Sequence, residues 1–154
     1  IAASLTDMAR SLDYPSHAPE IPKMISQINS YLKQSDLAPR LRNLVLLRVS
    51  LINECGYCID LHSSEASKDD EDGERIARIL EWATCDLFSA SEKAALGWAE
   101  SVTQLDGAEN LNSSFAPLAE DFDEKTISDL TFLVATMNAW NRMAVSLGRS
   151  PAQG

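Results

Sequence analysis

Apolar residues recur at intervals of three and four along most of the chain, and this spacing constrains the fold more than any other feature of the sequence. It predicts helices over residues 36–53, 53–67, 91–105 and 123–147, with a further helical stretch at 76–82. No stretch alternates convincingly between apolar and polar residues with a period of two. We therefore expect an all-α fold, a single-domain helical bundle of about six helices with short or absent strands.

Length and charge limit the number of domains and the kinds of partner that this chain can have. The 154 residues, 45% of them apolar, are enough for one self-sufficient core, so we expect one domain over 1–154 with its core at about 36–147. The 23 acidic residues outnumber the 13 basic ones, and the net charge of −10 repels phosphate backbones and anionic lipid heads. Neither nucleic acid nor a membrane is expected as a partner. Without a signal-peptide pattern or an apolar run of spanning length, a cytoplasmic location is expected.

The three cysteines are odd in number and too few for a disulfide scaffold. Two of them form the motif Cys55-x-x-Cys58, and His62 follows four residues later. In a reducing compartment this motif indicates redox or metal chemistry. The third cysteine, Cys85, has no histidine near it in the sequence and is expected to be a small residue of the core.

The spacing of the motif suits thiol chemistry. Positions i, i+3 and i+7 of a helix share one stripe, so Cys55, Cys58 and His62 are expected to point the same way. The thiolate is the reactive form, an imidazole can take the thiol proton, and a helix start favours negative charge. A sulfenic acid on one cysteine can then condense with the other to a disulfide, which a dithiol reopens. The pairing with His62 favours Cys58 as the attacking residue and Cys55 as the resolving one, although the first cysteine attacks in thioredoxin-like motifs.

Three other interpretations of the motif stay open. Zinc would need a fourth ligand, and only His17, Cys85 or carboxylates remain to supply it. A structural disulfide would close too small a loop to constrain the unfolded chain much. Two buried, inert cysteines are also compatible with a helix, although three reactive residue types on one stripe make coincidence less attractive. Neither a metal nor another cofactor is therefore expected.

The stretch from Arg48 to His62 resembles the AhpD-like branch of the carboxymuconolactone decarboxylase superfamily, whose signature is Glu, eleven residues, then Cys-x-x-Cys-x-x-x-His. The likeness extends to residues 92–100 and 138–142, and covers roughly 36–147. It implies an all-helical homo-oligomer, a trimer or hexamer, that reduces hydroperoxides through the cysteine pair. It also implies re-reduction by a dithiol, such as a protein-bound dihydrolipoyl group. By position, the peroxidatic residue is Cys58, with Cys55 resolving and His62 in the proton relay.

One position departs from this signature. The glutamate of the family, twelve residues before the first cysteine, falls on Asn43, which cannot carry a proton but can orient His62 by a hydrogen bond. Glu54 is a candidate substitute if the helix includes it, since it would then lie one turn before Cys58. An ordinary exposed glutamate of the first turn is the favoured interpretation. Tyr57 is expected only as a neighbour of the site.

The sequence as a whole predicts a thiol-dependent peroxidase or disulfide oxidoreductase of the alkylhydroperoxidase type, acting in antioxidant defence. Two alternatives remain. One is a decarboxylase acting on a lactone, as in the other branch of the superfamily, whose members do not rely on a cysteine pair. The other is a non-enzymatic, oligomeric redox sensor whose disulfide changes its assembly, which the departure at Asn43 keeps open.

Overall fold

The computed structural model describes residues 11–69 and 72–149. Within these residues the chain forms eight α-helices and one short 3-10 helix, with no strand, and six of the helices have 13 residues or more. The expected all-α bundle of about six helices is therefore confirmed. The elements are α2 (Tyr14–His17), α3 (Glu20–Lys33), α4 (Pro39–Ile52), α5 (Gly56–Lys68), α6 (Gly73–Ala77), η1 (Ile79–Glu81), α7 (Ala90–Gln104), α8 (Ala108–Asp121) and α9 (Glu124–Ser146).

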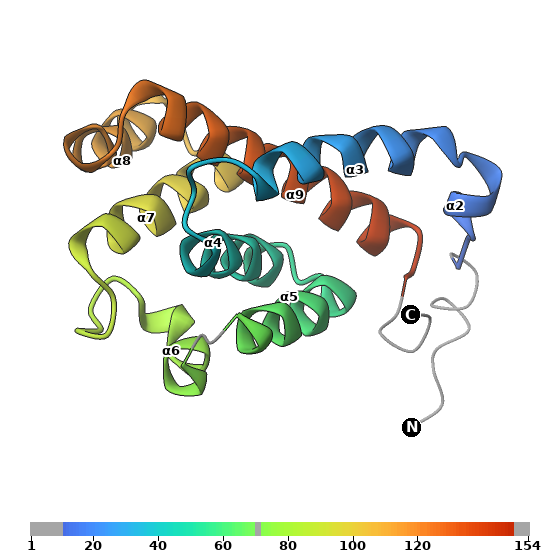
Figure 1. Cartoon of the computed structure of the whole chain (residues 1–154), viewed down its shortest axis with the longest axis horizontal. Coiled ribbons are helices and arrows are strands. Elements are labelled where there is room, and N and C mark those ends of the chain that lie inside the picture. The colour runs from blue at the N-terminus through green and yellow to red at the C-terminus, as the bar shows by residue number, and fades with distance from the viewer. Residues whose placement is uncertain (1–10, 70–71, 150–154) are drawn as a thin grey trace.

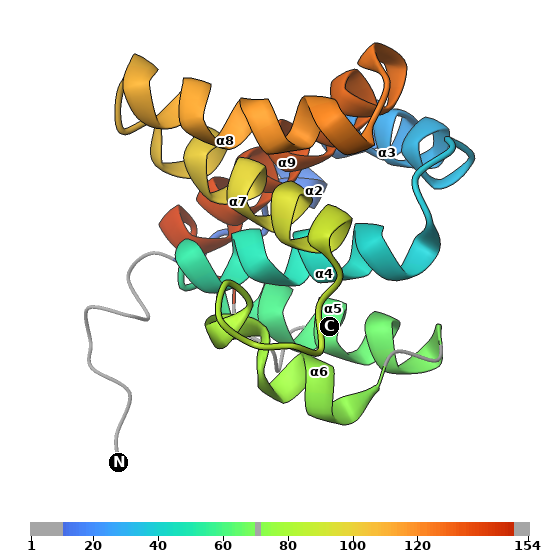
Figure 2. The ribbon, with the colours of Figure 1, turned by 90° about the vertical axis from the view of Figure 1, so that its left-hand side faces the viewer.

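Helix α4 lies in the middle of the bundle. It packs against α5, α7 and α9, with α3, α8 and α9 on one side and α5 and α6 on the other (Figures 1 and 2). Its side chains are the most completely buried of any helix, because almost every turn faces a neighbouring helix. The fully enclosed residues are Leu44, Val45 and Val49. Helix α4 is thus the surface on which α5 is positioned.

Two of the three long helices after residue 89, α7 and α9, follow their predicted ranges closely. Helix α9 begins after Asp123, whose carboxylate accepts a hydrogen bond of 2.8 Å from the backbone N–H of Thr126. Helix α7 begins one residue before its predicted start, because Ser89 and Glu92 cap it reciprocally. The predicted helical stretch at 76–82 is instead divided between α6 and η1.

The start of α5 differs from the prediction. The helix was predicted to begin at residue 53, but Asn53 is the C-cap residue of α4 instead. Glu54 follows in the left-handed conformation, with φ of 53°, and the chain re-enters a helix after Cys55, which is the N-cap residue of α5. The turn between the two helices therefore ends at the cysteine motif, and only the second cysteine lies within the helix.

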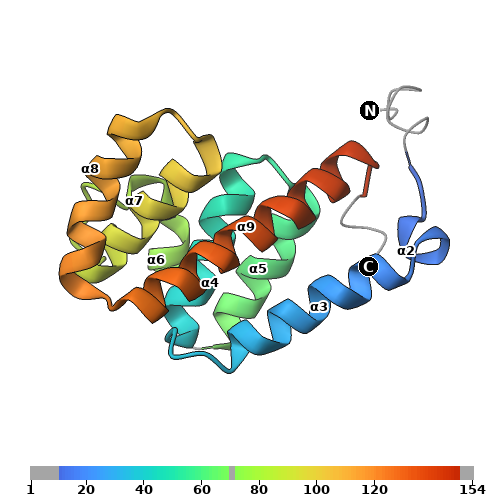
Figure 3. The ribbon, with the colours of Figure 1, turned by 90° about the horizontal axis from the view of Figure 1, so that it is seen from above.

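Helices α3 and α8 were not predicted. In α8 the apolar residues Leu111, Phe115 and Leu118 recur at helical spacing, but Pro117 lies inside the helix and Leu118 is its one buried residue. Helix α3 likewise buries only Leu32 and runs alongside α9 (Figure 3). Tertiary contacts stabilise both helices. Among the described residues, none of the helices has the length and apolar character needed to cross a bilayer.

Candidate active site

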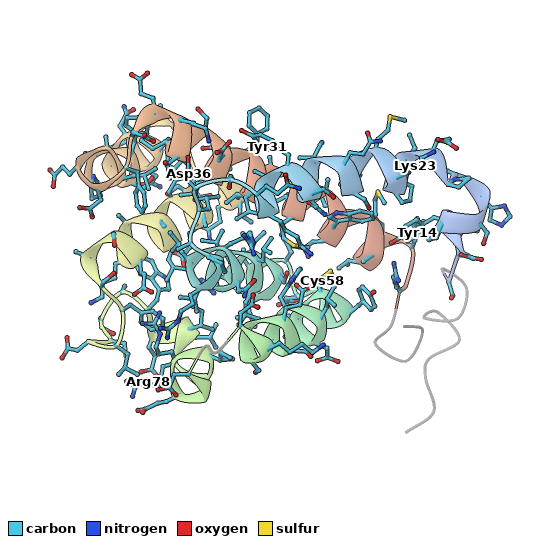
Figure 4. All side chains as sticks on the ribbon, in the orientation of Figure 1. Tyr14, Lys23, Tyr31, Asp36, Cys58 and Arg78 are labelled. Atoms are coloured by element: carbon cyan, nitrogen blue, oxygen red, sulfur yellow. A yellow bond between two sulfur atoms is a disulfide. The ribbon has the colours of Figure 1, made fainter. Side chains whose placement is uncertain are left out.

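The two cysteines of the motif lie where α5 begins, and they are joined by a disulfide with Cα atoms 5.3 Å apart. Figure 4 shows Cys58 at the inner side of this helix start, toward α4 and α9. Backbone N–H groups in the first turn of a helix have no intrahelical acceptor, and the helix dipole favours negative charge there. Once the disulfide is reduced, this position favours the thiolate form of Cys58.

A cavity of about 250 Å³ lies between α3, α4, α5 and α9, and Cys58 lines it. Cys55 does not line this cavity and is only 1% exposed. Seven of the fifteen other lining residues are apolar: Leu32, Leu46, Leu61, Leu133, Met137, Trp140 and Ala144. A small molecule in the cavity can therefore reach the sulfur of Cys58 but not that of Cys55.

His62 lines the same cavity one turn after Cys58, and its ring is held by Glu65. The Nδ1 atom of His62 lies 2.8 Å from Oε2 of Glu65. This hydrogen bond is the main reason why the pKa of Glu65 lies below its ordinary value, so the carboxylate is ionised and can only accept. Nδ1 therefore donates to Glu65, which leaves Nε2 as the atom that can exchange a proton with a ligand in the cavity.

Glu65 is a residue that the sequence analysis missed. A signal was present, since Cys58, His62 and Glu65 follow one another at intervals of four and three, which places them on one face of a helix. In the family signature the glutamate lies before the motif, at the position of Asn43 in this chain. In this protein a carboxylate lies on α5 itself, one turn beyond the histidine.

Neither of the two other candidates is hydrogen-bonded to His62, whose ring pairs with Glu65. Asn43, considered as the residue that orients the imidazole, is buried and donates a hydrogen bond of 2.7 Å to Asp69 at the end of α5. Glu54 lies in the turn before α5, is exposed, and does not line the cavity. The condition for its role, a helix that already includes it, is therefore not met.

Tyr57, expected as a neighbour, lines the cavity together with Tyr14 and Arg149. The guanidinium of Arg149 donates to the hydroxyl of Tyr14 at 3.1 Å and to that of Tyr57 at 3.0 Å. It also lies over the ring of Tyr57, 4.1 Å from the ring centroid. These contacts, with a backbone hydrogen bond from Leu12 to Leu147, bring the two ends of the described chain together beside the cavity (Figures 3 and 4).

A buried network of amides supports the turn that carries Cys55. The side-chain N–H of Asn53 donates to Oδ1 of Asn138 at 2.9 Å and to Oδ1 of Asn141 at 3.0 Å. Asn141 in turn donates to the hydroxyl of Ser50 at 3.3 Å. Helix α9 thus fixes the end of α4, which explains why the buried residues Asn138 and Asn141 are polar.

The remaining reactive residues lie apart from this site. Cys85 is free and buried in the core, as expected, and His17 is exposed at the end of α2. In residues 11–69 and 72–149, no three or more His, Cys, Asp or Glu side chains are grouped so that they could hold a metal ion.

Comparison with known proteins agrees with this arrangement. Residues 19–101 match the carboxymuconolactone decarboxylase family. The uncharacterised protein YdfG of Bacillus subtilis (strain 168) is 34% identical over 145 residues, which cover 94% of this chain and 99% of YdfG. The chain therefore belongs to the carboxymuconolactone decarboxylase family.

Solved structures narrow the assignment within that family. ATU0492 of Agrobacterium tumefaciens, a protein of unknown function with a suggested assignment as the antioxidant defence protein AhpD, superimposes with a TM-score of 0.86 at 28% identity, covering 92% of this chain and 97% of ATU0492. A peroxidase-related protein of Ralstonia eutropha JMP134, with an alkylhydroperoxidase AhpD core, superimposes with a TM-score of 0.76 at 21% identity, covering 90% of this chain and 74% of that one. The second likeness shows the fold alone. Within its family, the chain belongs to the AhpD-like branch.

Proposed function

We propose that this protein is a thiol-dependent peroxidase that reduces organic hydroperoxides through Cys55 and Cys58, in antioxidant defence. The observation that carries the proposal is the composition of the cavity. Cys58 opens onto an apolar space beside His62, whose ring is oriented by the ionised Glu65, while Cys55 is held behind it. This arrangement separates an attacking sulfur from a resolving one.

In the first half of the proposed cycle, His62 takes the proton of the Cys58 thiol. The thiolate then attacks the outer oxygen of the hydroperoxide, and the O–O bond breaks. Cys58 becomes a sulfenic acid, and the leaving alkoxide takes the proton from His62 and departs as an alcohol. Glu65 stabilises the imidazolium that forms between the two proton transfers.

In the second half, the thiol of Cys55 attacks the sulfenic acid of Cys58, which forms the disulfide and releases water. An external dithiol, for which a protein-bound dihydrolipoyl group is a candidate, then reduces the disulfide and is itself oxidised to a disulfide. No metal or other cofactor takes part. The homo-oligomer implied by the family resemblance remains part of the proposal.

The first test is a hydroperoxide titration of the fully reduced protein, read by intact mass and by counting the remaining thiols. The wild type is expected to lose two hydrogens and two thiols. Cys58→Ser is expected to keep its thiols, whereas Cys55→Ser is expected to gain one oxygen on Cys58, which a sulfenic-acid trap captures. Cys85→Ser, a change in the core away from the cavity, is the matched control and keeps the wild-type result. Full peroxide consumption by Cys58→Ser would contradict the proposal.

The two alternatives predict different results. A lactone decarboxylase keeps its activity when Cys55 and Cys58 are both changed to serine, because that reaction does not use the pair. A redox sensor changes its assembly when the disulfide forms, so its mass by light scattering differs between oxidised and reduced samples. The buried position of the disulfide behind a cavity favours the peroxidase over both.

A further inference from the structure

Basic side chains gather around the cavity of an otherwise acidic protein. The chain carries a net charge of −10, yet three of the residues that line the cavity are cations and only one, Glu65, is a carboxylate. The cations are Lys33, Arg42 and Arg149. An anion is therefore attracted to this site, whereas the molecule as a whole repels it.

Two of the cations lie at the end of the cavity near Glu65. The charges of Lys33 and Arg42 contribute to the lowered pKa of Glu65, after the larger effect of its hydrogen bond to His62. Arg42 is buried and donates only one long hydrogen bond, of 3.5 Å, to the backbone carbonyl of Lys33. At this end the positive charge is thus partly balanced within the protein.

Arg149 at the opposite end is balanced differently. Its two hydrogen-bond acceptors are the neutral hydroxyls of Tyr14 and Tyr57, and it forms no ion pair with a carboxylate in the described part of the chain. A guanidinium has five N–H donors, so donors remain for a ligand. Arg149 and Cys58 line the same cavity, so a ligand held by Arg149 shares this space with the attacking sulfur.

We propose that the substrate of this site is an apolar hydroperoxide that carries a carboxylate, and that Arg149 binds the carboxylate. This inference rests on the proposed function and names its substrate class. A guanidinium matches the two oxygens of a carboxylate, and the leucine, methionine and tryptophan side chains of the cavity match a hydrocarbon body. The volume of about 250 Å³ is small for a ligand pocket, so the hydrocarbon body is short.

A kinetic comparison tests the substrate class. A short-chain hydroperoxide acid and its methyl ester share one carbon skeleton, so the ratio of their kcat/KM values isolates the charge. The wild type is expected to favour the acid roughly 10- to 100-fold, the range of a hydrogen bond to a charged group. Arg149→Gln is expected to lower the ratio toward one, and Arg149→Lys to restore part of it.

The matched control is Arg78→Gln, since Arg78 is exposed, pairs with Glu81 and does not line the cavity. It is expected to keep the wild-type ratio. A wild-type ratio of one or less would overturn the proposal. So would an unchanged ratio in Arg149→Gln, including the case in which both rates fall together because the change only damages the fold.

A binding measurement separates this inference from the proposed function. Calorimetry with octanoate and with methyl octanoate, neither of which can react, is expected to show tighter binding of the acid by the wild type but not by Arg149→Gln. If that difference is found while no hydroperoxide is consumed, the ligand class holds and the peroxidase proposal fails. If hydroperoxides are consumed while octanoate binds no better than its ester, the peroxidase stands and the ligand class is wrong.

Discussion

At the scale of single residues, the carboxylate beside His62 comes from Glu65 on α5, whereas the family signature has its glutamate at the position of Asn43 on α4. The position of the family glutamate on α4 is Asn43, which bonds to Asp69, while Glu65 on α5 holds His62. The motif itself could be predicted from the sequence, and so could Glu65, because intervals of four and three define one helical face. The partner of Asn43 could not, since Asp69 reaches it only through the packing of α5 on α4.

This substitution of roles leads to a prediction for Glu65→Gln. The amide keeps the shape of the side chain but cannot stabilise the imidazolium, so single-turnover oxidation of Cys58 should slow about 10- to 100-fold, at the lower part of the range for general acid–base catalysis. Stopped-flow mixing of reduced protein with hydroperoxide measures this rate. Asp60→Asn removes the same charge from the exposed side of α5 and should leave the rate unchanged. An equal effect of the two variants would rule out the relay.

At the scale of elements, the boundary between α4 and α5 decides which groups reach the cavity. The apolar period runs through this boundary, so the sequence placed the start of α5 at Asn53. The chain in fact breaks there, because the side chain of Asn53 bonds to Asn138 and Asn141 on α9 and Glu54 adopts a positive φ. Contacts with a helix that lies 85 residues further along the sequence are invisible to a local pattern.

The left-handed backbone of this turn gives a second prediction, on stability. A residue with a side chain is strained at φ of 53°, whereas glycine is not, so Glu54→Gly should raise the free energy of unfolding by about 1 kcal/mol. Leu105→Gly, at φ of 54° after α7, should do the same and serves as the matched control. Urea unfolding measures both. Peroxidase turnover should be retained in Glu54→Gly, and its loss would return a catalytic role to Glu54.

At the scale of the whole molecule, acid should destabilise the fold. Glu65 and Glu92 both have pKa values below the ordinary 4.5 in the folded protein. For Glu65 the hydrogen bond to His62 is the main cause. For Glu92 burial raises the pKa, but hydrogen bonds from Arg75 and Ser89 together lower it by more than burial raises it. As the pH falls below about 4.5, the unfolded chain therefore binds more protons than the folded protein does, so acid favours unfolding.

The expected result is a midpoint of thermal unfolding that is level near neutral pH and falls progressively below about pH 4.5. Melting curves between about pH 3 and pH 7 measure it. Glu92→Gln should be less stable than the wild type at neutral pH but should lose less stability toward acid. A parallel decline in both proteins would show that these interactions do not determine the acid sensitivity.

The packing of the whole molecule contains features that could not be predicted from the sequence. Of the six long helices, α3 and α8 were not predicted, although apolar residues recur at helical spacing in both, as Ile21, Ile25, Ile28 and Leu32 do in α3. Each buries a single residue, so the sequence does not show which neighbour it packs against. The cavity is built from elements at both ends of the described chain, so that Tyr14 and Arg149 meet across 135 positions of sequence. The chemistry of the motif could be predicted, but the charge and shape of the space around it could not.

Because Cys55 is buried and does not line the cavity, an incoming molecule meets Cys58 first. Since Cys58 is the cysteine of the pair that lines the cavity, the proposed hydroperoxide and dithiol both react at the same sulfur and cannot bind at the same time. In the proposed cycle the incoming dithiol would attack Cys58, form a mixed disulfide there and release the thiol of Cys55, and its own second sulfur would then release Cys58. In the proposed cycle the hydroperoxide and the dithiol also compete for the cavity, so a high concentration of the dithiol slows the reaction with the next hydroperoxide. The turnover rate in this cycle depends on the relative concentrations of hydroperoxide and dithiol as much as on the reactivity of the Cys58 sulfur.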